Sequence, residues 1–470
     1  MLDKPSLLSR FGAIVGTRHV IADAQDMERY LIEDRGLYHG RALCVVRPGN
    51  LAEVSRLMAV CDETNTKVVP QGGNTGLVGG QIPYESGDEI VLSLARLTAI
   101  REVDPSSNTM IVEAGVTLLR AQEEAEKVER LFPLSLASEG SCTIGGNVST
   151  NAGGTAVLAY GNARDLVLGL EVVLADGRVL LNLSKLKKDN TGYDLKHLFM
   201  GAEGTLGIIT AAVLKLFPRP RANATAFVGL ADPKAALSLL TLAQERAGQS
   251  LVTFEMLPRL GIDYVLRHSS GARDPLSGPH AWYVLMELAS QTEHGLEETA
   301  ETILGDALEQ GIAEDAVLAA SLDQRNAFWR LREHLSEVQK HEGGSIKHDV
   351  SVPIAAVPEF IQKATATVEA ALPGARVLAF GHLGDGNIHF NVSQPIGADK
   401  EAFLARWHEI NDVVHAIVAG YAGSISAEHG IGRLKRDLLP QVKDPVALDV
   451  MRALKRTLDP KGLLNPGKVL

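Results

Sequence analysis

A histidine-containing segment in the second half of the chain has the residue types and spacing best suited to chemistry. It runs from Gly381 through His-Leu-Gly-Asp-Gly-Asn-Ile-His-Phe to Asn391. Its glycine-rich middle is typical of a turn between two strands, which would bring His382 close to His389. Strand alternation then places His389 and Asn391 on one face. Two imidazoles and an amide are therefore predicted to point the same way.

A carboxylate and a third histidine follow downstream. The segment Ser426-Ala-Glu-His-Gly-Ile-Gly432 offers Glu428 and His429 on a short extended piece. Two histidines and one carboxylate around an open position form the ligand set of a catalytic Zn²⁺, and Mn²⁺ or Fe²⁺ accept the same set. The alternative interpretation is that His382 and His389 are core residues with satisfied polar atoms. Spacing alone does not choose between the two.

Two cations could recognise an acidic substrate. In the helix predicted over 328–339, apolar residues form a buried stripe, and Arg332 and Ser336 lie four positions apart on the adjoining face. The Arg332 guanidinium can pair with a carboxylate through two hydrogen bonds. Lys347, on the predicted strand 345–353, could supply a second cation. Either side chain could instead be a solvated surface group.

Glycine is the second unusual feature of the sequence, with 45 residues in a chain of 470. Three stretches concentrate it, at 70–80, 141–154 and 201–209. Backbone N–H groups with no Cβ in the way can wrap an anion such as a pyrophosphate. Each stretch alone could be only a mobile loop. Three in one domain, poor in charge and framed by strands, favour a bound ligand because such loops are otherwise costly to order.

The elements that must position these residues are predicted to form an α+β fold of two domains and a tail. Through residue 219, short strands rich in Val, Ile and Leu alternate with glycine-rich turns and a few helices. The segment 218–223, with two prolines and two arginines, predicts a boundary. Residues 220–424 then show two similar, ferredoxin-like halves, which predicts a substrate domain with one antiparallel sheet covered by helices on one face. Residues 425–470 are predicted to return and pack on the first domain.

Composition excludes several classes of protein. Hydrophobic residues make up 45% and charged residues 22% of the chain, as in ordinary globular proteins, and no apolar run approaches the ~20 residues of a membrane helix. The net charge of −11 argues against a nucleic-acid partner. The N-terminal segment has no signal-peptide pattern, which predicts a cytoplasmic location. No G-x-G-x-x-G sequence occurs, which argues against a nicotinamide cofactor bound by that fingerprint.

Four phrases in the first domain resemble a known family of flavoproteins. They are PQGGNTGLVGG, GGNVSTNAGG, AYGNARD and GAEGTLGIIT, and they are similar to segments of the vanillyl-alcohol oxidase and p-cresol methylhydroxylase family. The resemblance covers nearly the whole chain. It implies a first domain of two subdomains that binds FAD through glycine-rich loops. Some members attach the flavin through a His or Cys in the first loop, but residues 70–80 contain neither, which implies non-covalent FAD.

The same resemblance implies a set of cofactor-binding residues. They occupy the three glycine-rich stretches and short segments near them. By position they are Pro70, Gln71, Gly72, Gly73, Asn74, Thr75, Gly76, Leu77, Gly79, Gly80, Ser138, Gly140, Ser141, Thr143, Gly145, Gly146, Asn147, Thr150, Asn151, Gly153, Gly154, Tyr160, Gly161, Glu203, Gly204, Gly207, Ile209 and Asn465.

The histidine segments carry a second resemblance. GHLGDGNIHFN and SAEHGIG are similar to the signature of FAD-linked D-2-hydroxy acid dehydrogenases, in which two histidines and a glutamate hold a divalent metal beside the flavin. By position this implies His382, His389 and Glu428 as ligands of zinc, or of manganese or iron, and His429 as the general base. The positions that resemble the substrate pocket of D-2-hydroxyglutarate dehydrogenases are Arg332, Ser336 and Lys347. Asn391, on the same strand face as His389, is predicted to join them in binding the substrate.

Together these resemblances imply an FAD-dependent, metal-assisted dehydrogenase. It would oxidise a small D-2-hydroxy acid, first of all D-2-hydroxyglutarate, to the 2-oxo acid by hydride transfer to flavin N5. A dicarboxylate would use both Arg332 and Lys347. The alternatives are a D-lactate or glycolate dehydrogenase of the same family and, from another class, a non-catalytic flavin sensor or carrier. The electron acceptor is left open among an electron-transfer flavoprotein, a quinone and a cytochrome, and dimers that occur among relatives make a homodimer the candidate oligomer.

Overall fold

The computed structural model describes residues 4–470, which divide into two compact units. The first unit contains the described residues up to Gly153, then Gly161–Arg219 and Glu428–Leu470. The second unit contains Gly154–Tyr160 and Pro220–Ala427. The chain thus changes unit at 219/220 and at 427/428, where the sequence predicted 219/220 and 424/425. The short segment Gly154–Tyr160 of the second unit was not predicted.

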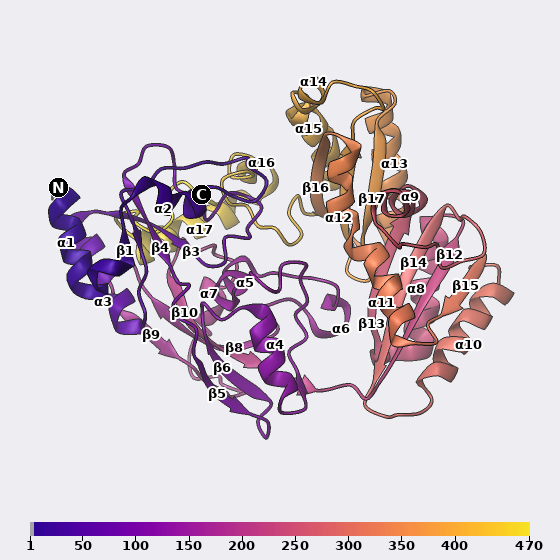
Figure 1. Cartoon of the computed structure of the whole chain (residues 1–470), viewed down its shortest axis with the longest axis horizontal. Coiled ribbons are helices and arrows are strands. Elements are labelled where there is room, and N and C mark those ends of the chain that lie inside the picture. Colours follow the sequence, from indigo (N-terminus) through magenta and orange to yellow (C-terminus); the bar gives the residue numbers. More distant parts are fainter. Residues whose placement is uncertain (1–3) are drawn as a thin grey trace. The chain divides into compact units, whose positions relative to one another are not determined.

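The first unit contains two main sheets (Figure 1). One has the strand order β1-β2-β4-β3, in which β2, β4 and β3 are parallel, and the other is antiparallel with the order β5-β6-β10-β8-β9. The two sheets correspond to the two subdomains expected of an FAD-binding domain. The elements of this unit are α1 (Lys4–Val15), η1 (Thr17–His19), β1 (Val20–Ile21), α2 (Ala24–Leu31), β2 (Val45–Val46), α3 (Leu51–Thr64), β3 (Lys67–Gln71), β4 (Glu89–Ser93), β5 (Ile100–Asp104), β6 (Thr109–Glu113), α4 (Leu118–Glu126), β7 (Arg130–Leu131), α5 (Ile144–Thr150), β8 (Val167–Val173), β9 (Val179–Asn182), α7 (Lys196–Phe199), β10 (Ile208–Lys215), β11 (Phe217–Pro218), α16 (Leu439–Val442) and α17 (Pro445–Leu458).

Helix α3 shows how local sequence places the first glycine-rich stretch. Asn50 caps its beginning, because the Asn50 side chain accepts a hydrogen bond from the Glu53 N–H at 3.0 Å. Asn65 ends it in the left-handed conformation, with φ of 57°. Val54 and Leu57 are buried in the core that the helix shares with the parallel strands. The chain then enters β3, so the stretch 72–80 begins at the carboxyl end of a buried parallel strand.

The second unit is built on one antiparallel sheet with the strand order β15-β12-β14-β13-β17-β18-β16. Strands β12 to β15 come from one half and β16 to β18 from the other, so the halves join where β13 pairs with β17. That junction aligns Glu255 with His382 and Met256 with Gly381. The elements of this unit are α6 (Val157–Tyr160), β12 (Ala222–Leu230), α8 (Pro233–Ala247), η2 (Gly248–Ser250), β13 (Leu251–Pro258), α9 (Arg259–His268), β14 (Trp282–Ser290), α10 (Leu296–Glu309), β15 (Asp315–Leu318), α11 (Leu322–Glu333), α12 (Leu335–Val338), η3 (Gln339–Glu342), β16 (Ser345–Ser351), η4 (Ile354–Ala356), α13 (Val357–Ala371), β17 (Arg376–His382), β18 (Asn387–Ser393), α14 (Lys400–Leu404) and α15 (Trp407–Gly420).

Helices cover both faces of this sheet, whereas the sequence predicted one covered face (Figure 1). Helices α8, α10, α13 and α15 pack on one face, over a core that includes Phe254 and Phe390. Helices α9, α11 and α12 pack on part of the other face, against Tyr283 and Phe380. The single-face prediction was wrong because several strands are apolar on both faces, and both faces must then be removed from water.

The C-terminal segment packs on the first unit, as the sequence predicted. Beyond α17 it lies beside β3, where the Val68 N–H donates to Leu463 O and the Asn465 N–H donates to Val68 O, both at 2.8 Å. The buried Asp459 carboxylate accepts hydrogen bonds from the Leu463 and Leu464 N–H groups at 2.9 and 2.8 Å. Within residues 4–470, no helix is both long and apolar enough to cross a membrane.

Candidate functional site

The three glycine-rich stretches meet in the first unit. A Cβ on Gly73 would lie 2.0 Å from Ser141 O, and a Cβ on Gly204 would lie 2.6 Å from Pro70 Cγ. The Glu203 N–H donates to Ser149 O at 2.8 Å. Only glycine permits the two close approaches, so the stretches form one continuous region of backbone, as a shared cofactor would require.

Four buried side-chain oxygens in this region have no hydrogen-bond partner among the described residues. They belong to Gln71, Asn74, Thr143 and Asn465, all of which are predicted cofactor residues. The amide nitrogens are held by the protein: Gln71 Nε2 donates to Tyr30 O and Asn465 Nδ2 donates to Gly80 O, both at 2.9 Å. The oxygens therefore remain as acceptors, and unpartnered buried acceptors are costly. FAD carries hydroxyl and N–H donors that would satisfy them, so these residues fit the cofactor.

Other predicted cofactor residues are engaged with the protein or lie elsewhere. The Glu203 carboxylate accepts hydrogen bonds from the Ile431 and Gly432 N–H groups at 2.7 and 2.8 Å. Asn151 Oδ1 accepts from a backbone N–H at 2.9 Å, and Ile209 lies inside β10 with 2% of its surface exposed. Tyr160 belongs to the second unit, whereas its neighbour Gly161 belongs to the first. The Glu203 carboxylate and Asn151 Oδ1 thus already have protein partners.

The predicted histidine hairpin is present in the second unit. Strand β17 ends at His382 and β18 begins at Asn387, and their pairing sets His389 opposite Phe380. The rings of His382 and His389 lie 5.5 Å apart between centroids, at an interplanar angle of 78°. Asn391 follows two positions along β18 on the same face as His389. The predicted turn and strand alternation are therefore confirmed.

A buried acid beside His382 was not predicted from the sequence. Glu255 Oε1 lies 2.6 Å from His382 Nδ1, and Glu255 Oε2 accepts a hydrogen bond from Arg332 Nε at 2.6 Å. Burial alone would raise the pKa of the Glu255 carboxyl, but His382 and Arg332 lower it to about 2. One signal was available in the sequence, because Glu255 is the only charged residue in the apolar strand β13.

The helix predicted over 328–339 is in fact two helices. Helix α11 ends at Glu333 and α12 begins at Leu335. His334 lies at the junction, and its Nδ1 is 2.7 Å from Ser269 Oγ at the end of α9. Arg332, on α11, is buried, whereas Ser336, on α12, is exposed. The contact of His334 with the end of a third helix stabilises this break. The apolar pattern of residues 328–339 does not reveal that contact.

The remaining predicted substrate residues lie on neighbouring strands. Lys347 on β16 pairs in register with Asn391 on β18, and Asp349 pairs with His389. Asn391 Nδ2 donates to Gln339 Oε1 at 2.9 Å, and both side chains are buried. Gln339 was not predicted as a site residue, because it lies in η3, far along the chain from the strand that it contacts. The structure thus places Lys347, Asn391 and the histidines on one face of the sheet.

The donor atoms needed for a metal ion are close together. Glu428 comes directly after the last residue of the second unit, whose N–H donates to Asp349 O at 3.3 Å. The ligand atoms that His382, His389 and Glu428 offer all lie within 4.8 Å of one another, and so do those of Asp349, Glu428 and His429. Imidazole nitrogens with carboxylate oxygens suit Zn²⁺, Mn²⁺ or Fe²⁺. These donors therefore fit a divalent ion.

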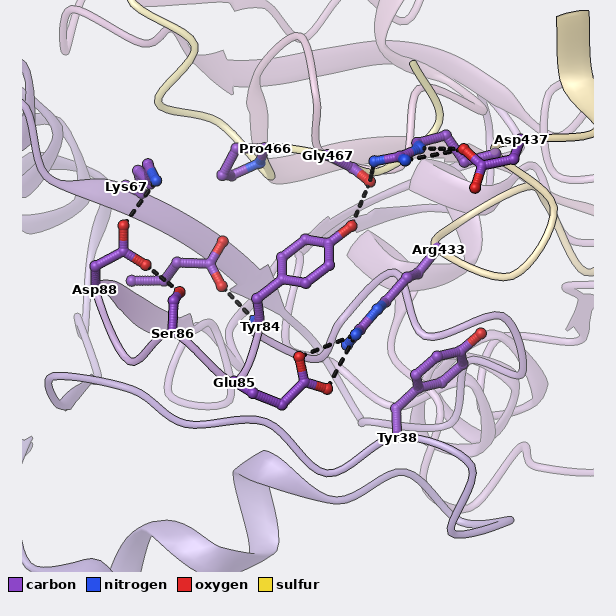
Figure 2. A pocket seen from close by; sticks show the side chains of 12 residues that line it. Tyr38, Lys67, Tyr84, Glu85, Ser86, Asp88, Arg433, Asp437, Pro466 and Gly467 are labelled. Atoms are coloured by element: carbon purple, nitrogen blue, oxygen red, sulfur yellow. Dashed lines mark hydrogen bonds and ion pairs between the residues drawn. The ribbon is translucent and has the colours of Figure 1, made fainter.

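A separate cavity of about 660 Å³ lies in the first unit, and none of the predicted site residues lines it (Figure 2). The Arg433 guanidinium lies 4.9 Å from the Tyr38 ring and 4.2 Å from the Tyr84 ring, and it donates to Glu85 at 2.9 Å. The Tyr84 hydroxyl donates to Gly467 O at 2.7 Å. Residues of the tail thus form hydrogen bonds and ring contacts with residues of the loop before β4 across this cavity.

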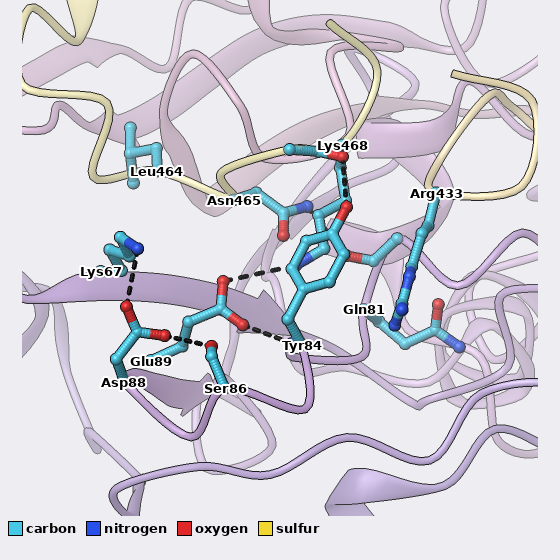
Figure 3. A network of polar contacts seen from close by, with 12 residues as sticks. Lys67, Gln81, Tyr84, Ser86, Asp88, Glu89, Arg433, Leu464, Asn465 and Lys468 are labelled. Atoms are coloured by element: carbon cyan, nitrogen blue, oxygen red, sulfur yellow. Dashed lines mark hydrogen bonds and ion pairs between the residues drawn. The ribbon is translucent and has the colours of Figure 1, made fainter. Parts of the chain in front are cut away.

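A buried ion pair lies next to this cavity (Figure 3). Lys468 Nζ is 3.5 Å from Glu89 Oε1 and 4.5 Å from the centre of the Tyr84 ring, and the Lys468 side chain is fully buried. Glu89 Oε2 accepts a hydrogen bond from the Tyr84 N–H at 2.5 Å. Burial lowers the pKa of Lys468 to about 8, although Glu89 opposes that change. These contacts hold the end of the chain against the sheet.

Known proteins resemble this chain over nearly its whole length. Residues 42–181 match a family described as FAD binding domain, and residues 219–469 match one described as FAD linked oxidases, C-terminal domain. A mitochondrial D-2-hydroxyglutarate dehydrogenase of Arabidopsis thaliana is 38% identical over 98% of this chain and 81% of its own length. D-2-hydroxyglutarate dehydrogenase of Xanthomonas citri pv. viticola is 36% identical, over 99% and 97%. The solved structure of substrate-bound p-cresol methylhydroxylase matches with a TM-score of 0.78 at 16% identity, over 99% of this chain and 96% of that one, which shows a shared fold.

Proposed function

Because this chain belongs to the family of FAD-linked oxidoreductases that contains the D-2-hydroxyglutarate dehydrogenases, we propose that it oxidises D-2-hydroxyglutarate to the 2-oxo acid. The observation that carries the proposal is the cluster of His382, His389 and Glu428, in a chain whose relatives of that name match it almost from end to end. FAD, when bound, supplies the hydride acceptor at N5. A divalent metal, when bound, lowers the pKa of the substrate hydroxyl.

The chain's own residues supply binding and proton transfer. His382, His389 and Glu428 would hold the metal, of which zinc is the first choice and manganese or iron the alternatives. His429 would accept the proton from the substrate hydroxyl oxygen as its α-carbon loses hydride. His429 Nε2 lies 3.7 Å from Glu428 Oε1, so the proposed general base is adjacent to a proposed metal ligand.

The second carboxylate of the substrate is the feature that separates hydroxyglutarate from lactate. Arg332 uses Nε for Glu255, so its terminal nitrogens are the ones that could bind a substrate carboxylate in a bidentate manner. Lys347 and Asn391 lie side by side on neighbouring strands and would bind the same substrate. D-Lactate or glycolate has no second carboxylate for these cations.

An anaerobic substrate screen tests the proposal directly. D-2-hydroxyglutarate should bleach the flavin absorbance of the metal-supplied protein, chelation should prevent bleaching while the oxidised flavin spectrum persists, and His382→Ala should behave like the chelated protein. If no 2-hydroxy acid bleaches the flavin, the protein is a flavin sensor or carrier and the proposal is wrong.

The substrate is assigned by comparing kcat/KM for D-2-hydroxyglutarate and D-lactate in wild type and Lys347→Ala. The variant should lose efficiency mainly toward the dicarboxylate, because only that substrate has a charge for Lys347 to pair with. Equal losses would favour D-lactate or glycolate as substrate.

The proposed acceptors are tested by supplying an electron-transfer flavoprotein, a quinone or a cytochrome to the reduced protein. The mass of the protein in solution tests the proposed homodimer. Cell fractionation tests the proposed cytoplasmic location.

A further inference from the structure

Glu255 occupies an unusual position for a carboxylate. It lies in the apolar strand β13 with none of its side chain exposed, where an isolated charge would be very costly. Strand β13 pairs with β17 over only two residue pairs, and one of them sets Glu255 against His382. The carboxylate is therefore placed by the register that joins the two halves of the sheet.

Both oxygens of this carboxylate have a donor. Oε2 accepts from Arg332 Nε, and Oε1 lies 2.6 Å from His382 Nδ1. An ionised carboxylate can only accept hydrogen bonds, so Nδ1 of His382 must carry the proton. The other ring nitrogen, Nε2, is then left with its lone pair, which is the form in which a neutral imidazole binds a metal.

We propose that Glu255 is the positioning residue of the metal site: it holds the proton of His382 on Nδ1, presents Nε2 to the metal, and anchors the substrate-binding Arg332 through the same carboxylate. This inference rests on the proposed function, because it assumes that His382 binds a metal. It adds a residue that couples the orientation of a metal ligand to that of a substrate cation.

A buried pair on the adjacent strand offers a matched control. Glu287 on β14 is also buried on this side of the sheet, and it receives hydrogen bonds from Arg325 Nε and the Arg325 terminal nitrogen, both at 2.8 Å. Thr225 and Trp329 complete its contacts. Glu287 thus resembles Glu255 as a buried carboxylate paired with an arginine of α11, but no histidine of residues 4–470 is bonded to it.

The test measures Zn²⁺ affinity of the FAD-loaded, chelator-treated protein by competition with a chromophoric chelator. Glu255→Gln should weaken Zn²⁺ binding about 10- to 100-fold, the usual effect of removing a carboxylate that orients a metal-bound histidine. Glu287→Gln should bind Zn²⁺ as the wild type does, even if its Tm falls. Glu255→Asp retains the charge but shortens the reach, so it should fold and still bind Zn²⁺ more weakly than the wild type.

Three outcomes would overturn the inference. Wild-type affinity in a folded Glu255→Gln or Glu255→Asp protein would mean that His382 does not depend on Glu255. Equal loss in the Glu255→Gln and Glu287→Gln proteins would assign both carboxylates a structural role only. A wild-type protein that binds no divalent ion would remove the metal site altogether, whereas flavin bleaching by D-2-hydroxyglutarate would still decide the proposed oxidation by itself.

Discussion

Glu203 should make the stability of the first unit depend on pH. Its carboxylate accepts hydrogen bonds from the Ile431 and Gly432 N–H groups and so ties the tail to the glycine-rich stretches. A Cβ on Gly430 would lie only 2.7 Å from Glu203 Oε1, which shows how closely the tail is packed on it. Burial raises the pKa of the Glu203 carboxyl to about 7, against the lowering by the two N–H donors and by Lys435.

The sign follows from proton linkage. An unfolded glutamate has a pKa of about 4.3, so between about pH 4.5 and 7 the folded protein binds more protons than the unfolded chain, and its free energy of unfolding falls as pH rises. The stabilising contribution of Glu203 is therefore fully present below about pH 4.5 and lost once pH passes about 7. A shift of about 2.5 units at about 1.4 kcal/mol per unit sets a ceiling of about 3.5 kcal/mol, and the partial exposure of this residue makes about 2 kcal/mol the expected value.

Glu203→Gln removes this titration while keeping the shape of the side chain. The free energy of unfolding of wild type minus that of the variant should fall by about 2 kcal/mol between pH 4.5 and 8. Flavin fluorescence on release of FAD should follow unfolding, because Trp282, Trp329 and Trp407 all lie in the second unit and report on it alone.

The control is Glu123→Gln, at an exposed position of α4 in the same unit. Its difference from wild type should stay flat across the same pH range. If the Glu203→Gln difference is equally flat, the Glu203 carboxyl has an ordinary pKa and the burial argument is wrong. If the free energy of unfolding of wild type minus that of Glu203→Gln rises with pH, the two N–H donors outweigh burial in setting the pKa of Glu203.

Three further predictions concern the cofactor region and the tail. Gly73→Ala should abolish FAD retention, since the added Cβ would lie 2.0 Å from Ser141 O; a flavin-to-protein absorbance ratio equal to that of wild type would contradict this. Asp459→Ala should lower the free energy of unfolding by about 3 kcal/mol or more in urea, because it removes the acceptor of two buried N–H groups and the ion-pair partner of Lys455; a loss under about 1 kcal/mol would show that the tail does not depend on it. Burial lowers the pKa of Lys468 to about 8, so the charged side chain destabilises the folded state. The free energy of unfolding of the wild type should therefore increase by about 3 kcal/mol relative to that of Lys468→Met as pH rises from 8 to 10.5. Parallel pH profiles of the two proteins would refute the buried charge.

Local features of the site could be predicted from the sequence because they depend on a few neighbouring residues. The glycine-rich turn and the two-residue alternation of a strand are sufficient to bring His382 near His389 and to place Asn391 on the same face. The glycine-rich stretches were likewise recognised from composition. Composition is informative here because only glycine permits an approach as close as that of Gly73 to Ser141. The antiparallel sheet of the second unit was predicted from its alternating strands and helices, whereas the parallel pairing of β2, β4 and β3 was not predicted.

Contacts between distant segments were decided only by the tertiary structure. Glu255 and His382 are 127 residues apart, and they meet because of the register between β13 and β17. A register shifted by two residues would bury the same apolar face, so no hydrophobic pattern specifies the observed one. The same reason explains the Asn391–Gln339 contact and the attachment of the tail to Glu203. The sequence by itself determined which groups could do chemistry, and long-range pairing determined which groups hold them in place.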